Sequence, residues 1–316
     1  MRSPGAPLYR VEGGFALPAG DAEWVTARSG RRLRAAKFAP PESRGSVVLS
    51  TGRTEPLEKY GEVISDLVAR GFTVLAHDWA GQGLSERFSA DRMQGDVIGG
   101  ANAFLGDFRD LLDAFEQDLP RPWFAVAHSM GAALTALALV DGEARFAGAC
   151  LCAPMIQFSV GKLPFGVVQT VVGLAGLARF GTKLARQEVD PAKAEFENNP
   201  LTHDRDRFAR ARALYQAHPD LQLGAPTWRW LSFAVELRDR LLREGAVERI
   251  ACPVACVIAA DDSIVDIAAI QRFASRLRNG SATLVPGSFH EILMERDEQR
   301  GVFFQVFDAL VAKTQG

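Results

Sequence analysis

Short apolar segments that lack a regular alternation with polar residues recur along this chain, and they constrain its fold more than any other feature. Examples are "SVVLS" at Ser46–Ser50, "WFAVAH" at Trp123–His128 and "PVACVIAA" at Pro253–Ala260. Strands of this composition are typical of a parallel sheet that is covered on both faces. The segments between them carry apolar residues at helical spacing, as in Asn102–Gln117, which indicates the covering helices.

The sequence therefore predicts an α/β fold with a mostly parallel eight-stranded sheet and helices on both faces. The strand pattern stops between Pro154 and about Arg249, where the chain is helical and polar. We expect an insertion at residues 154–250, which divides the core into a first part, residues 1–153, and a second part, residues 251–316. The predicted strands, of which the first two are short and antiparallel, are Val25–Ala27, Leu33–Phe38, Ser46–Ser50, Phe72–Asp78, Trp123–His128, Phe146–Ala153, Pro253–Ala260 and Ser281–Gly287.

The composition narrows the class of protein only a little. Hydrophobic residues make up 47% of the chain, charged residues 23%, and the net charge is −2, which are ordinary values for a soluble globular protein. The balance of charge gives no support to nucleic-acid binding, and no basic run marks an anionic membrane surface. The N-terminal residues lack the apolar stretch of a signal peptide, so the cytoplasm is the expected compartment.

The four cysteines, Cys150, Cys152, Cys252 and Cys256, lie in apolar, strand-like segments. A free cysteine in such a place behaves as a small hydrophobic residue. A zinc site is the alternative, but C-x-C and C-x3-C at this separation match no common ligand spacing. We predict buried thiols and no metal site.

Ser129 stands at the joint between a predicted strand and a helix, in "AHSMG". A nucleophile elbow has this strand–turn–helix shape because its serine must project from a strained turn at the carboxyl end of a sheet. The positions two residues before and after the serine must be small, and Ala127 and Gly131 meet that requirement. The alternative is an ordinary strand–helix turn that happens to contain a serine.

A nucleophilic serine needs a histidine that follows it in the chain. Two of the five histidines precede Ser129, and His203 and His218 lie in the insertion, where we expect them to be exposed to solvent. His290 directly follows the last predicted strand, in "VPGSFHEILMERD", where a loop can bring its imidazole to the serine. We therefore select His290.

The acid of such a site should follow the preceding strand, where "IAADDSIVD" supplies three aspartates. Asp262 is the first choice and Asp261 the reserve, whereas Asp266 is expected to cap the next helix. The serine, the acid and the histidine then agree both in order and in place.

These residue types suit nucleophilic catalysis. A serine hydroxyl is a weak nucleophile near neutral pH, and a histidine can accept and return its proton. A buried carboxylate holds the imidazole in the required tautomer. Two backbone N–H groups are expected to bind the oxyanion: that of Met130, next to Ser129, and that of Arg53, in the loop where Gly52 permits a close approach.

With these residues in place, the chain resembles the α/β-hydrolase superfamily, and more closely the monoacylglycerol lipase and bacterial lysophospholipase group of serine hydrolases. The resemblance rests on "GRTEPLEKYGEVISDLVARGFTVLAHDWAGQGLS", "AHSMGA", "NPLT", "DDSIV" and "GSFHEILMERD", and it covers the chain from about Trp24 onward. Two positions depart from the family pattern: Thr51 stands where the family has histidine, and Ala80 where arginine is frequent. Asp78 and the glycines after it are interpreted as structural.

The resemblance implies a serine esterase that removes the fatty acyl chain of a lysophospholipid or a monoacylglycerol without a metal or an organic cofactor. The insertion then corresponds to a helical cap whose apolar segment, Pro164–Phe180, either packs on the core or forms an acyl-chain wall and touches the inner membrane face. Val171 and Val172, within Gly166–Ala178, are the expected wall residues. The alternatives are a general carboxylesterase for short soluble esters and a non-catalytic binding protein on the same fold.

Overall fold

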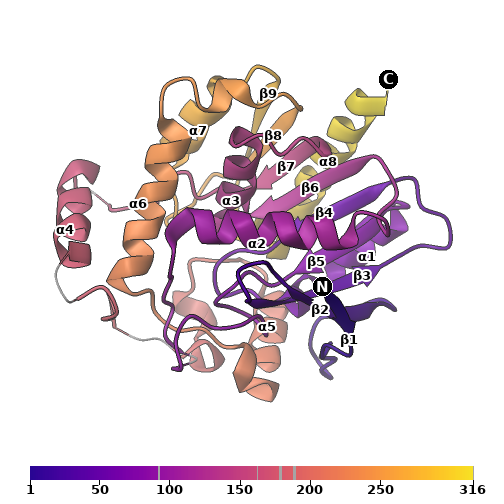
Figure 1. Ribbon diagram of the computed structural model, residues 1–316, viewed down its shortest axis with the longest axis horizontal. Coiled ribbons are helices and arrows are strands. Elements are labelled where there is room, and N and C mark those ends of the chain that lie inside the picture. Colours follow the sequence, from indigo (N-terminus) through magenta and orange to yellow (C-terminus); the bar gives the residue numbers. More distant parts are fainter. Residues whose placement is uncertain (92, 162, 178–179, 188–189, 316) are drawn as a thin grey trace.

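The structure is a computed structural model that describes residues 1–91, 93–161, 163–177, 180–187 and 190–315. A single twisted sheet forms its centre, and helices cover both of its faces (Figure 1). The strands are β1 (Arg2–Pro4), β2 (Asp21–Thr26), β3 (Arg32–Phe38), β4 (Ser46–Ser50), β5 (Thr73–His77), β6 (Trp123–His128), β7 (Phe146–Cys152), β8 (Val254–Ala259) and β9 (Gly280–Val285). The α-helices are α1 (Gly61–Ala69), α2 (Gly100–Phe115), α3 (Ser129–Val140), α4 (Phe165–Leu177), α5 (Arg205–Ala217), α6 (Trp228–Leu242), α7 (Ile267–Ser275) and α8 (Asp297–Gln315).

The sheet confirms the predicted α/β class. Its order is β1-β2-β3-β5-β4-β6-β7-β8-β9, with antiparallel pairing from β1 to β5 and parallel pairing from β5 to β9. It has nine strands rather than the eight expected, because Arg2–Pro4 adds an edge strand to β2. Three residues that include a proline carry no apolar pattern, so this strand could not be expected from its composition.

Two layers of helices bury the two faces of the sheet in separate cores. Helices α1 and α8 pack on one face around Phe72, Phe124 and Phe307. Helices α2, α3 and α7 pack on the other face, where Phe108 and Trp123 belong to the larger core. Every residue of α3 is buried, because α2 and α6 cover the side of α3 that the sheet leaves open. That burial explains why its sequence, "SMGAALTALALV", is apolar all round.

The segment between β7 and β8 contributes no strand to the sheet in the part that the structure describes. It contains α4, α5 and α6, of which α6 packs on α3 and α2, and α4 packs on the outer side of α6 (Figure 1). None of the described helices combines the length and the apolar character needed to cross a bilayer.

The order of the central strands places two loops side by side. Strand β4 lies between β5 and β6, and its last residue, Ser50, is in register with Ala127 of β6. After β4 the chain forms β5 on one side of β4, and it then crosses over to form β6 on the other side. The carboxyl end of β4 is therefore a topological switch point, the place where open α/β sheets bind ligands. The loop after β4 and the turn after β6 meet at this point.

Candidate active site

Ser129 occupies a strained turn at the carboxyl end of β6. Its φ is +50°, a left-handed conformation that residues with a side chain rarely adopt, whereas the preceding His128 is extended. Gly131 explains why the turn can close. A Cβ at that position would lie 2.3 Å from the carbonyl oxygen of Thr51. The turn after β6 and the loop after β4 therefore approach each other more closely than any residue but glycine permits.

The structure brings Ser129 together with His290 and Asp262. The Nε2 atom of His290 lies 2.8 Å from the Oγ of Ser129, and its Nδ1 lies 2.7 Å from the Oδ2 of Asp262. The other carboxylate oxygen of Asp262 accepts hydrogen bonds from the amides of Ile264 and Val265, at 2.8 Å and 3.0 Å. These residues, each chosen from its place in the sequence, form one continuous chain of hydrogen bonds.

The environment keeps Asp262 ionised. Burial alone acts to raise its pKa, but the hydrogen bond and the charge of His290, together with two amide donors, hold that pKa below the ordinary value. Asp261 is exposed, and it contributes its amide to the carbonyl oxygen of Ser288. Asp266 caps α7 by accepting a hydrogen bond from the amide of Ala269, which confirms its expected role.

Two residues that follow β5 hold the loop after β4 in place. The indole N–H of Trp79 donates to the carbonyl oxygen of Thr51 at 3.0 Å, and the amide group of Gln82 donates to that of Gly52 at 2.6 Å. The Arg53 amide therefore belongs to a loop that is clamped beside Ser129. Met130 lies in the first turn of α3, where amides have no acceptor within the helix.

Asp78 has the structural role expected of it. Its carboxylate accepts hydrogen bonds from Arg34 and from the amides of Leu57 and Leu84. A Cβ at Gly83 would lie 2.1 Å from the carboxyl carbon of Asp78, so the glycine permits this close approach. The aspartate thereby joins the loop after β5 to the start of the helical segment after β4.

His203 and His218 are not exposed to solvent, although the sequence suggested that they would be. His203 is half-buried, stacks on Phe289 and lies 2.8 Å from Glu295. His218 is half-buried and stacks on Tyr9, with ring centroids 3.7 Å apart. Both lie between β7 and β8, and contacts with residues outside that segment withdraw them from solvent. The expectation was wrong because those partners are distant in the sequence.

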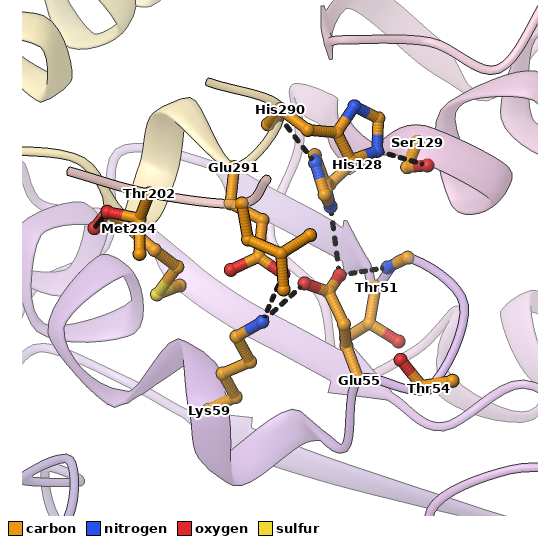
Figure 2. A network of polar contacts seen from close by, with 12 residues as sticks. Thr51, Thr54, Glu55, Lys59, His128, Ser129, Thr202, His290, Glu291 and Met294 are labelled. Atoms are coloured by element: carbon orange, nitrogen blue, oxygen red, sulfur yellow. Dashed lines mark hydrogen bonds and ion pairs between the residues drawn. The ribbon is translucent and has the colours of Figure 1, made fainter. Parts of the chain in front are cut away.

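Sequence reasoning missed a buried polar network behind the candidate triad (Figure 2). The carboxylate of Glu55 accepts hydrogen bonds from the Gly52 amide at 2.7 Å, from Lys59 at 2.8 Å and from His128, whose Nδ1 lies 2.9 Å away. Lys59 also pairs with Glu291 at 2.5 Å. The i,i+4 spacing of Glu55 and Lys59 is visible in "EPLEK", but the other partners are far along the chain.

The two partners of His128 favour the protonated form of its imidazole. The Nδ1 faces the carboxylate of Glu55, and the Nε2 lies 3.2 Å from the backbone carbonyl oxygen of His290. Both partners accept hydrogen bonds, so both ring nitrogens must donate. Burial acts to lower the pKa of His128, but the charge and hydrogen bond of Glu55 outweigh it and raise that pKa. His128 thus links Glu55 to the backbone that carries the imidazole of His290.

Glu291, next to His290 in the sequence, points toward Lys59 in the network, and its amide donates to the carbonyl oxygen of Leu201 at 2.8 Å. The neighbouring Thr202 donates to the carbonyl oxygen of Met294 at 2.7 Å. The "NPLT" segment, which lies between β7 and β8, therefore fixes the loop that carries His290.

Among the described residues, no group of three or more His, Cys, Asp or Glu side chains is arranged to hold a metal ion. The four cysteines are free thiols. Cys150, Cys152 and Cys256 are buried as predicted, whereas Cys252 is half-buried because it precedes β8 rather than lying within it.

Comparison with known proteins finds relatives that are all named as hydrolases. The family model described as "Hydrolase_4: Serine aminopeptidase, S33" matches residues 41–297. Lysophospholipase L2 of Escherichia coli K12 is 31% identical over 285 residues, which cover 85% of this chain and 81% of that protein. Human monoglyceride lipase is 32% identical over 111 residues, or 35% of each chain. The crystal structure of a soluble variant of Saccharomyces cerevisiae monoglyceride lipase covers 94% of this chain and 97% of its own, with a TM-score of 0.71 at 17% identity, and confirms the α/β-hydrolase fold.

The Glu55 network leads to a prediction about stability. Glu55→Gln removes the buried negative charge that Lys59 and His128 face, so the free energy of unfolding should fall by about 3–5 kcal/mol in urea titrations near pH 6. The raised pKa of His128 means that its share of this stability is complete below the unfolded value of 6.5 and is lost as the pH rises through the folded value. The difference between wild type and Glu55→Gln should therefore shrink in part toward alkaline pH.

Glu116→Gln is the matched control. Glu116 forms an ion pair with Arg121 in which both side chains are close to half exposed, so its loss should change the free energy of unfolding by no more than about 1 kcal/mol. Equal effects of the two substitutions would contradict the role given to Glu55.

Proposed function

The chain belongs to the hydrolase family described as "Hydrolase_4: Serine aminopeptidase, S33", and from this membership we propose that it is a serine esterase that removes the fatty acyl chain of a lysophospholipid or a monoacylglycerol. The observation that carries the proposal is the hydrogen-bonded chain of Ser129, His290 and Asp262, with Ser129 in its strained turn. The proposed substrate class follows from the relatives, which are a lysophospholipase L2 and a monoglyceride lipase.

In the proposed reaction, the Oγ of Ser129 attacks the carbonyl carbon of the ester while its proton passes to the Nε2 of His290, 2.8 Å away. The imidazolium that results is stabilised by the ionised Asp262 at its Nδ1. The negative charge that develops on the carbonyl oxygen is held by the backbone N–H groups of Arg53 and Met130.

The tetrahedral intermediate then breaks its bond to the leaving alcohol, which takes the proton from His290 and departs as a glycerol or a glycerophospho compound. The acyl group remains on Ser129 as an ester. A water molecule attacks this ester and passes a proton to His290, and a second collapse releases the fatty acid and restores the Ser129 hydroxyl. Each step uses only groups of this chain and water, so we assign no metal and no organic cofactor.

We propose that residues 154–250 form the cap of this enzyme and that its outer face contacts lipid. Helix α4 exposes Val167, Val171 and Leu174, whose spacing of four and three residues places them on one face of the helix, and Leu163, two residues before the helix, is exposed as well. Lys183 and Arg186, both exposed, follow in the chain. An apolar stripe near basic residues is suited to the surface of a bilayer that contains anionic lipids.

The orientation of α4 changes the expected role of one residue. Val172 is buried against the rest of the protein, whereas Val171 is 49% exposed on the outer stripe and lines no internal wall. Ala178, the last residue of the expected wall segment, lies outside the described residues. We therefore propose a cytoplasmic enzyme, peripheral on the inner membrane face, and the four free thiols support a reducing compartment.

The experiment that tests the proposed function is a hydrolysis panel. Lysophosphatidylcholine, lysophosphatidylethanolamine, monoacylglycerol and p-nitrophenyl esters of rising chain length should be compared by kcat/KM. We expect long-chain lysolipid or monoacylglycerol esters to exceed p-nitrophenyl acetate. A preference for short soluble esters would instead identify a general carboxylesterase, and no hydrolysis of any ester would contradict the proposal.

Ser129→Ala should abolish covalent labelling by a fluorophosphonate probe, because the probe reacts with an activated serine hydroxyl. The measurement is in-gel fluorescence followed by mass spectrometry of the labelled peptide, with Ser159→Ala as a control that keeps full labelling. Labelling of the Ser129→Ala protein at another serine would show that the nucleophile is not Ser129.

Asp262→Asn should lower kcat by roughly 10⁴-fold, because an asparagine favours the wrong tautomer of His290. Asp261→Asn is the matched control: its side chain is exposed, so the loss should be below about threefold. Both values come from steady-state kinetics on one soluble ester after circular dichroism has shown that the variants are folded. Comparable losses in the two variants would refute the choice of Asp262.

Leu174→Glu on α4 should weaken binding to vesicles that contain phosphatidylglycerol, because it places a negative charge in the stripe that we propose contacts the bilayer. Leu174 is 63% exposed, so the substitution should leave the fold intact. The measurement is co-sedimentation with the vesicles, and binding should fall at least about fivefold. Leu284→Glu, at a 48% exposed leucine of β9, is the control that should bind as the wild type does. Equal binding by both variants would exclude α4 as the contact.

A further inference from the structure

The side chain of Arg53 is held in a fixed place beside the proposed oxyanion loop. Its Nη2 donates to the carbonyl oxygen of Gly224 at 2.6 Å, and its guanidinium lies 5.0 Å from the ring centroid of Trp230. A Cβ on Gly95 would come within 2.1 Å of the same Nη2, so the glycine leaves room for the guanidinium. The chain thus builds a site around this cation from three separate segments.

No carboxylate of the described residues pairs with Arg53, although the side chain is half-buried. Its Nε is buried without a hydrogen-bond partner, and its Nη1 makes no hydrogen bond to any residue in the described part of the chain. Burial and the nearby positive charge of Arg186 lower the pKa of Arg53 to about 9. A half-buried cation without a carboxylate partner is costly, and a second cation beside it adds to that cost.

Other buried cations of this chain are neutralised by its own carboxylates. Arg34 forms ion pairs with Glu58 and Asp78, and Lys59 with Glu55 and Glu291. The chain therefore has the means to compensate a buried cation, but at Arg53 it leaves two guanidinium nitrogens without a hydrogen bond and the charge without a carboxylate partner among the described residues. An anion from outside the chain completes such a site.

We propose that Arg53, assisted by Arg186, binds the phosphate of the substrate head group, so that the protein acts on lysophospholipids in preference to neutral monoacylglycerols. This inference rests on the proposed esterase function and names the substrate within it. A planar guanidinium presents paired N–H donors that match the oxygens of a phosphate.

The position of Arg53 in the loop favours this assignment. Its backbone N–H is the proposed donor to the oxyanion, so its side chain starts beside the ester carbonyl. In a glycerol-based lysophospholipid the phosphate is separated from that ester by the three glycerol carbons. The three methylene groups of arginine span a comparable distance, so one residue can contact both groups.

The test compares a lysophosphatidylcholine with the monoacylglycerol of the same acyl chain, both below their micellar concentrations, by the ratio of their kcat/KM values. In Arg53→Met the ratio should fall by about 10- to 100-fold, as expected for lost hydrogen bonds to a charged group. Arg53→Lys should recover part of the ratio, since lysine keeps the positive charge but lacks the paired N–H donors of the guanidinium. Arg186→Gln should lower the ratio less. Arg205→Met, at an exposed arginine of α5 paired with Glu197, should keep it unchanged.

A second measurement needs no activity on lipids. Glycerophosphocholine should inhibit wild-type hydrolysis of p-nitrophenyl butyrate competitively, and its inhibition constant should rise about tenfold or more in Arg53→Met. Inhibition by inorganic phosphate alone, with none by glycerophosphocholine, would show a site for free phosphate and contradict the proposal.

The outcomes separate the two levels of inference. If the wild type hydrolyses both lipids and Arg53→Met leaves their ratio unchanged, the phosphate site is wrong and the esterase function stands. If the folded wild type hydrolyses neither lipid, the proposed function itself fails.

Discussion

The geometry of the site depends on the hydrogen bonds that the buried carboxylate of Glu55 accepts. Through the Gly52 amide it fixes the loop after β4, and through His128 it fixes the backbone of His290 (Figure 2). Because the carboxylate is buried and bonded on every side, displacing any of its partners leaves a buried charge unsatisfied. The proposed oxyanion loop and the imidazole are therefore held in a fixed relative position before a substrate arrives, which is the condition for electrostatic stabilisation of a transition state.

The core of the fold could be predicted because parallel strands covered on both faces leave a continuous apolar record in the sequence. Seven of the eight predicted strands coincide with observed strands within three residues at each end, and the eighth, Val25–Ala27, overlaps the end of β2. The rest of the sheet depends on which strands pair with each other rather than on the composition of each strand. The edge strand β1 has no apolar residue, and it forms because β2 offers an unpaired edge.

The three residues of the proposed triad could be selected from their order because each lies in the turn or loop that follows a strand of the sheet, and the carboxyl ends of parallel strands meet at one edge. The network behind them could not. Glu55 and His128 are 73 positions apart, and Lys59 and Glu291 are 232 apart. The same limit explains the error at His203, whose partner Glu295 is 92 positions away. The local sequence pattern identifies which residues follow a strand, but it does not identify which charged side chains pair with each other in the buried network.

The loop after β4 separates two tasks within one residue. In the proposed mechanism the backbone N–H of Arg53 binds the developing charge of any ester, since an amide has no preference for the rest of the substrate. We propose that its side chain, which lies beside Trp230 and has no carboxylate partner among the described residues, binds a group several bonds away from the reacting carbonyl. Binding energy gained there raises kcat when the contact strengthens in the transition state, and it lowers KM when the contact is equal in both states. The division of an Arg53→Met effect between kcat and KM therefore shows whether the head group orients the ester for attack or only anchors it.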